Sequence, residues 1–140
     1  MKAIHTAAAI LTAGLIVLAP YASAHHSVNA EFDVNKNIPL TGVLTKVDLV
    51  NPHTYMYFDA KDASGKMQHW SFETGAPAAL KRAGISVRDT LIAGQTYKVV
   101  YSPAKNGGPL GLLHSITLPD GRFVAFGATN NVEAARELSK

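Results

Sequence analysis

The chain contains no cysteine among its 140 residues. Disulfide bonds, thiol redox chemistry, cysteine nucleophiles and cysteine-ligated zinc are therefore excluded, and the fold must be held together by its hydrophobic core. Charge is also sparse, because 13 Lys and Arg residues face 10 Asp and Glu residues, for a net charge of +3. The charges are spread without runs of either sign, so no basic patch is visible and we expect no nucleic-acid partner.

Long apolar runs are absent beyond the first 24 residues. The run over 7–19 follows Lys2 and precedes Pro20 and the small residues Ala22 and Ala24. This layout is typical of a secretory signal peptide, and the run is shorter than the roughly 20 residues of a membrane-spanning helix. We expect residues 1–24 to be a signal peptide and 25–140 to be one periplasmic domain without a stable membrane span. An uncleaved membrane anchor is the alternative.

Cleavage after Ala24 would make His25 the first residue of the mature protein. Its α-amine, its imidazole and the imidazole of His26 would then lie within a few ångströms of one another. Nitrogen donors in a tetragonal arrangement favour Cu(II) among the divalent metals. The sequence thus offers a candidate copper site, for which His53 is a further ligand. The alternative is that the two terminal histidines only begin a flexible arm.

Alternating apolar residues separated by turn signals predict an all-β domain with one short helix in its middle. We expect strands at 40–50, 54–60, 67–73, 96–102, 114–118 and 123–126. The helix is expected at 75–84, between the third and fourth strands. An irregular arm pinned by Phe32 spans 25–39, and a frayed C-terminal helix spans 130–140. This order is that of a small OB-like Greek-key barrel, with a β-sandwich as the alternative.

The predicted core contains Trp70, Phe72, Val43 and Val47, which lie at alternating positions of expected strands. Gly42 is the place in the first strand where we expect a bend or bulge. The sequence does not fix the register between the second and third strands, and a slip of one residue would exchange their two faces.

Tyr55, Tyr57 and Trp70 are candidates for a stacking platform that binds a small organic molecule or a glycan; packing in the core is the alternative role. His53 directly follows Asn51-Pro52, which breaks the first strand. A histidine at a loop edge can point across a barrel mouth, so His53 is the internal histidine best suited to a site. A hydrogen bond to its own turn is the alternative.

Catalytic motifs are missing from the sequence. Ser27 and Ser71 lie near histidines, but neither is part of a nucleophile elbow. Glu73 and Asp59 form no recognisable pair of acid and base. The loop at 105–108 lacks the Gly-Lys-Ser/Thr signature that binds phosphate. We therefore expect a binding protein rather than an enzyme, with no catalytic residues.

Several short motifs follow one another in order: His25-His26-Ser27, Phe32-Asp33, Leu40-Thr41-Gly42-Val43, Asn51-Pro52-His53, Trp70 with Glu73, Lys105-Asn106-Gly107 and Leu118-Pro119-Asp120-Gly121-Arg122. Together they resemble a family of small exported bacterial proteins, domain-of-unknown-function family 6152. Leu49 and Ile85 stand where we would expect tryptophan in similar proteins. The resemblance implies export and a small β-rich domain, without an established activity.

The leading hypothesis is a non-enzymatic periplasmic binding protein that binds Cu(II) through His25, His26 and His53. Copper is the only cofactor that the sequence suggests. One alternative is an OB-like binder of a small organic or glycan ligand. Another is an accessory subunit of an envelope complex, whose protein partner the sequence does not identify.

Overall fold

The computed structural model describes residues 27–126 and 132–140. Its strands are β1 (Ile38–Val50), β2 (His53–Lys61), β3 (Met67–Thr74), β4 (Thr96–Pro103), β5 (Leu110–Thr117) and β6 (Phe123–Ala125). Its helices are α2 (Val28–Glu31), α3 (Pro77–Arg82) and α4 (Val132–Leu138). Among the helices in this described part, none is long and apolar enough to cross a membrane.

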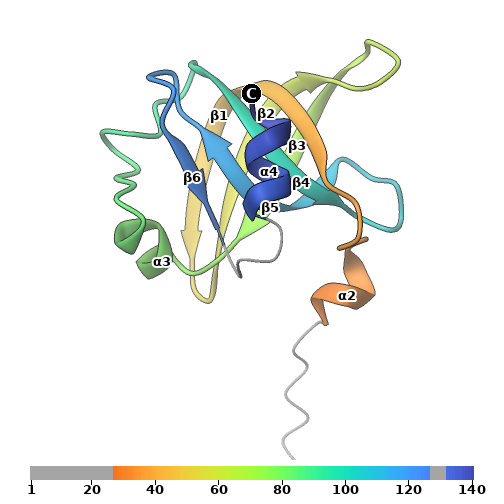
Figure 1. Ribbon diagram of the computed structural model, residues 1–140, viewed down its shortest axis with the longest axis horizontal. Coiled ribbons are helices and arrows are strands. Elements are labelled where there is room, and N and C mark those ends of the chain that lie inside the picture. Colours follow the sequence, from red (N-terminus) through yellow and green to blue (C-terminus); the bar gives the residue numbers. More distant parts are fainter. Residues whose placement is uncertain (1–26, 127–131) are drawn as a thin grey trace, which may run out of the picture.

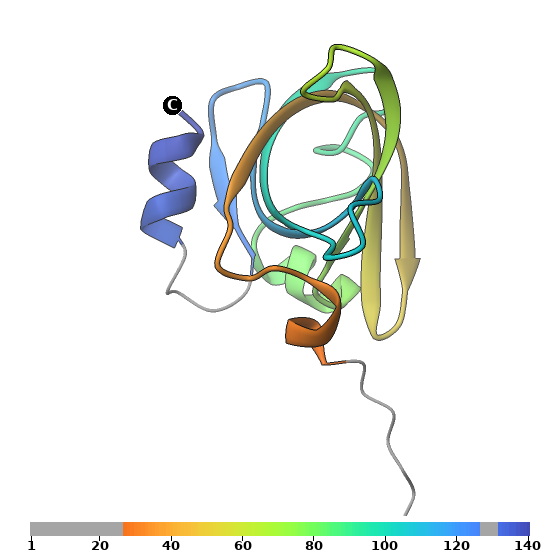
Figure 2. The ribbon, with the colours of Figure 1, turned by 90° about the vertical axis from the view of Figure 1, so that its right-hand side faces the viewer.

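The sheet closes on itself as a barrel, which Figure 2 shows from one end. Antiparallel pairs join β3 to β2, β2 to β1, β1 to β4 and β4 to β5, and a parallel pair of β3 with β5 closes the ring. α3 follows β3 and lies at the left-hand end of the barrel in Figure 1. These pairings and the position of the helix confirm the predicted OB-like barrel, rather than a sandwich of two sheets.

The core fills the barrel with aromatic and aliphatic side chains. Phe72 is fully buried, and its ring centroid lies 5.9 Å from that of Trp70 and 4.8 Å from that of Tyr101. Trp70 and Val47 are partly buried and pack against this cluster. The predicted core positions of Phe72, Trp70 and Val47 are therefore confirmed.

The predicted core position of Val43 is wrong, because its side chain is 37% exposed. The pairing of β1 with β2 shifts between Leu44 and Lys46, so that Thr45 is bulged. Leu44 points inward before the bulge, and Val47 turns inward after it. A bulge changes the phase of the alternation, so Val43 and Val47 face opposite sides. The irregularity predicted at Gly42 lies instead at Thr45, and Gly42 itself lies close against Ala60 of β2.

The arm and the C-terminal helix both pack against the barrel. The arm contains the four-residue helix α2, which the sequence did not predict, and Phe32 behind it is buried and bridged to Ala104. In α4, Ala135 is fully buried, and the guanidinium carbon of Arg136 lies 4.6 Å from the ring centroid of Phe123. These two contacts attach α4 to the barrel.

A buried polar chain also ties the arm to the barrel. The Ser102 hydroxyl donates to the carbonyl oxygen of Lys36 at 2.9 Å, and Nε2 of His114 lies 2.7 Å from the same hydroxyl oxygen. Because that hydroxyl already donates to Lys36, the geometry favours a proton on Nε2 of His114. Burial lowers the pKa of His114, since the charged imidazolium loses solvation in this position.

The seam between β3 and β5 should be intolerant of a larger residue at Gly111. A Cβ atom there would lie 2.4 Å from a ring carbon of Tyr101 and 3.0 Å from the ring of Phe72. We predict that Gly111→Ala lowers the free energy of unfolding by about 1–3 kcal/mol, as overpacking does. Denaturant unfolding measures this effect. Gly75→Ala is the control, because its Cβ would have only an ordinary contact at 3.5 Å. Equal stability of the two variants would contradict the packing described here.

Acid should weaken the fold partly through His114. The folded state lowers the pKa of this residue, so the unfolded chain binds more protons and stability falls as the pH drops below about 6.5. We predict that His114→Gln reduces the loss in free energy of unfolding between pH 7 and pH 5. Unfolding curves at both pH values test this. The same loss in the variant and the parent would show that His114 does not contribute.

Candidate functional site

Three polar side chains meet on the outer face of the barrel, near the start of β2 and the end of β3. Residues of β2 alternate, so that Thr54 and Met56 point inward and are fully buried, whereas His53 and Tyr55 lie on the outside. The register sets Tyr55 directly opposite Glu73 of β3. Side chains of directly opposite residues share a face of the sheet. His53, Tyr55 and Glu73 therefore form one group, called here the outer cluster.

Glu73 is the centre of the outer cluster, because each of its oxygens has a partner. Oε1 lies 2.8 Å from Nδ1 of His53, and Oε2 accepts a hydrogen bond of 3.4 Å from the Tyr55 hydroxyl. The Glu73 side chain is only 15% exposed, whereas that of His53 is 45% exposed. The carboxylate is thus enclosed by its partners, and the imidazole remains accessible to solvent.

Tyr55 stays a hydrogen-bond donor in this environment. Burial raises the pKa of its phenol, and the neighbouring negative charge of Glu73 raises it further. The phenol therefore keeps its proton at neutral pH and directs it to the carboxylate. The contact also helps to fix the rotamer of Glu73.

Within the described part of the chain, the contacts of His53 leave one of its nitrogens available to a ligand. Its Nδ1 is bound to Glu73, so Nε2 is the nitrogen that can coordinate a metal or accept a hydrogen bond. A carboxylate on the second nitrogen is the usual way in which proteins orient a metal-binding histidine. Over residues 27–126 and 132–140, however, no three His, Cys, Asp or Glu side chains are grouped to hold a metal ion. The outer cluster therefore provides one prepared ligand and not a complete site.

The other two predicted metal ligands, His25 and His26, lie outside the described residues. The described chain begins at Ser27, directly before α2. Figure 1 shows α2 at the lower right of the barrel and the connection between β1 and β2 at its lower left. The negative charge of Glu31, at the end of α2, contributes to the raised pKa of Tyr55. α2 is thus near enough to the outer cluster for the charge of its last residue to act on Tyr55.

The structure does not bring Tyr55, Tyr57 and Trp70 together as one platform. Tyr55 and Tyr57 lie on the outside of β2, whereas Trp70 packs inward against Phe72 and Tyr101. In addition, Nζ of Lys46 lies 5.5 Å from the ring centroid of Tyr57. Trp70 therefore has the alternative role, packing in the core. Because the three rings do not all lie on one face, a flat ligand cannot stack on all of them at once.

A second histidine–carboxylate pair occurs elsewhere on the same hairpin. Nδ1 of His69 lies 2.5 Å from Oδ1 of Asp59, and the His69 side chain is 88% exposed. This pair lies four residues along β3 from Glu73 and therefore does not join the outer cluster. His69 has the same type of partner as His53 but a far more open position.

Sequence reasoning identified His53 but not its partner Glu73. The partner of Glu73 cannot be recognised from the sequence, because it depends on the register between β2 and β3. The alternation of β2 and the position of His53 after Asn51-Pro52 were visible. Only the pairing of Tyr55 with Glu73 shows that the side chains of the outer cluster are neighbours.

Comparison with known proteins adds a family but no activity. No curated protein matches the chain. The sequence matches the model of a family of unknown function, DUF6152, over residues 12–114. This range includes His53, Tyr55 and Glu73 and extends from before the arm into β5. Because the match covers more than half of the chain, the protein belongs to the DUF6152 family, as the motifs in its sequence predicted.

Proposed function

We propose that this protein is exported, is cleaved after Ala24, and binds Cu(II) in the periplasm as a non-enzymatic binding protein. The proposed ligands are the α-amine and imidazole of His25, the imidazole of His26 and Nε2 of His53. The observation that carries the proposal is the 2.8 Å contact between His53 and Glu73. It fixes one nitrogen of an accessible imidazole and leaves the other available for a ligand.

The donor set suits Cu(II) better than the other common divalent metals. An amine and imidazole nitrogens are ligands that Cu(II) binds in a square or tetragonal arrangement, and Cu(II) stands at the top of the divalent affinity order. Hard ions such as Mg²⁺ or Ca²⁺ prefer several oxygen ligands. The outer cluster offers only one carboxylate, and both of its oxygens are already engaged.

The attachment of the arm limits where the terminal histidines can reach. Phe32 is buried, and Nζ of Lys105 donates a hydrogen bond of 2.5 Å to the carbonyl oxygen of Asn29. These contacts hold α2 against the barrel. His25 lies two residues before Ser27, a stretch that spans at most about 7 Å when extended. The terminal ligands must therefore find their partner near α2. The charge of Glu31 in α2 acts on Tyr55 of the outer cluster, which favours His53 as that partner.

The requirement for a free terminus can be tested directly. We predict that the protein beginning at His25 binds Cu(II) and that the same protein with an additional methionine before His25 loses most of its affinity, because the chelate needs the free α-amine. Calorimetry measures the affinity, and electron paramagnetic resonance reports the nitrogen ligands. The intact mass of the exported protein tests the cleavage site. Equal affinity of the two forms, or export with residues 1–24 retained, would contradict the proposal.

The role of the outer cluster needs a separate comparison. We predict that Glu73→Gln weakens Cu(II) binding by about 10–100-fold, as removal of an orienting carboxylate does at other metal sites. His53→Ala should remove one imidazole from the resonance spectrum. Asp59→Asn is the matched control, because it changes the same kind of pair at His69. Circular dichroism checks that the variants fold. If Glu73→Gln and Asp59→Asn have the same small effect, His53 is not a ligand.

A further inference from the structure

A cleft of about 450 Å³ lies between the end of β1 and the segment that contains α3. It is lined by Leu49, Pro77, Leu80, Lys81, Gly84, Ile85, Ser86 and Val87. The volume is within the range of small-molecule sites in proteins, about 300–1,000 Å³. None of these residues belongs to the outer cluster, so the cleft is a separate feature of the molecule.

The surface of the cleft is mainly apolar. Leu80 and Ile85 are buried, at 1% and 4% exposure, and belong to the barrel core. Leu49 forms another part of the lining, yet its side chain is 52% exposed. A leucine that is half open to solvent beside a buried apolar floor leaves apolar surface for a ligand to cover.

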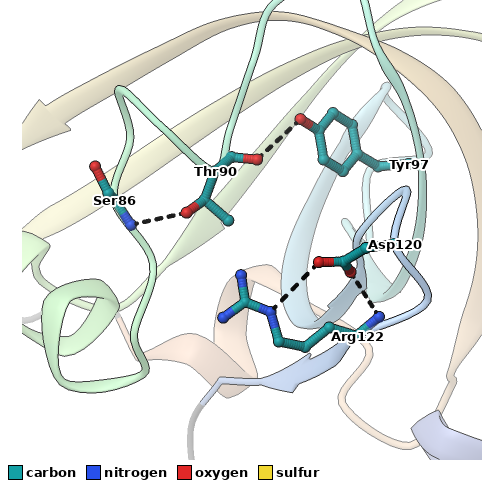
Figure 3. A network of polar contacts seen from close by, with 5 residues as sticks. All are labelled: Ser86, Thr90, Tyr97, Asp120 and Arg122. Atoms are coloured by element: carbon teal, nitrogen blue, oxygen red, sulfur yellow. Dashed lines mark hydrogen bonds and ion pairs between the residues drawn. The ribbon is translucent and has the colours of Figure 1, made fainter.

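The charge of the cleft is of one sign. Lys81 is the charged residue in its lining, and it belongs to none of the ion pairs within the described part of the chain. Arg122 approaches from the turn between β5 and β6, where its Nη1 would lie 4.0 Å from a Cβ atom on Gly84. Figure 3 shows its side chain extending toward the segment that carries Ser86. The Nε atom of Arg122 lies 3.9 Å from Asp120, a distance that leaves hydrogen-bonding capacity in the guanidinium.

The wall that carries Ser86 is preformed. The backbone N–H of Ser86 donates to the Thr90 hydroxyl at 3.3 Å, and the hydroxyl of buried Tyr97 donates to the Thr90 carbonyl at 3.1 Å (Figure 3). Tyr97 also accepts a hydrogen bond of 2.8 Å from the N–H of Ile92. Asp89, the nearby acid, is bound by the Ser86 hydroxyl at 2.8 Å and does not line the cleft.

We propose that this cleft binds a medium-chain fatty acid, a ligand with an unbranched apolar tail and one carboxylate. The tail lies on Leu49, Leu80 and Ile85, and the carboxylate is held by Lys81 with Arg122. A neutral hydrocarbon would satisfy the apolar lining but leave Lys81 without a partner among the described residues. A cationic amphiphile would be repelled by Lys81 and Arg122. The inference rests on a different site from the copper proposal and does not depend on it.

Decanoate is the probe for this proposal, with decan-1-ol as its uncharged counterpart. In a nuclear magnetic resonance titration of the ¹⁵N-labelled protein, decanoate should shift the amide signals of Leu49, Leu80 and Ile85. Decan-1-ol should bind about tenfold more weakly, because it lacks the charged hydrogen bonds to Lys81 and Arg122. Lys81→Gln should weaken decanoate binding and leave decan-1-ol binding unchanged.

A cleft-filling substitution makes the location of the site testable. Leu49→Trp should abolish binding of both probes, because the indole occupies the space of the tail. Val50→Trp is the matched control, since Val50 is similarly exposed, at 54%, but does not line the cleft. The proposal is overturned if decanoate does not bind, if it binds no more tightly than decan-1-ol, or if Leu49→Trp and Val50→Trp bind decanoate equally well.

Discussion

Closure of the barrel through the parallel pair of β3 and β5 is the constraint on which the rest of the structure depends. Without cysteine, no covalent bond can hold this seam. It is held by the ladder that sets Phe72 opposite Gly111 and by the packing of Tyr101 over both. The absence of a side chain at Gly111 lets two aromatic rings approach the backbone. The seam therefore combines a backbone pairing with close aromatic packing, since the ring centroids of Phe72 and Tyr101 are 4.8 Å apart.

The strand β3 that forms this seam also carries a residue of the outer cluster. Its antiparallel register with β2 on the other side sets Glu73 opposite Tyr55. The arm lies against the connection between β4 and β5, because Phe32 bridges to Ala104 and the N–H of Lys105 donates to the carbonyl oxygen of Glu31 at 2.9 Å. A buried core thus positions two surface features, the carboxylate that orients His53 and the helix through which the chain enters the fold.

The sequence predicted the fold better than the site, for a physical reason. Strands and turns have local signals, so the order of the elements and the barrel followed from alternation and turn residues. The bulge at Thr45 has no such signal, and it is why Val43 lies outside. The helix α2 has only four residues, too few to show a helical period. The partner of His53 depends on a register that sequence leaves open, and the opposite faces of Tyr55 and Trp70 depend on it too.

The two candidate sites originate from the same short connection. Val50 is paired with His53, and Leu49 is paired with Thr54. Residues that are directly opposite share a face, so the connection turns His53 outward with Val50 and keeps Leu49 on the side of the buried Thr54. One end of one hairpin therefore supplies an imidazole to the outer cluster and an apolar wall to the cleft. Leu49 and Ile85 are also the two positions at which similar proteins led us to expect tryptophan, and both line this cleft. An indole at either position would occupy space that the smaller side chains leave open. The cleft therefore depends on these two residues as well as on the barrel.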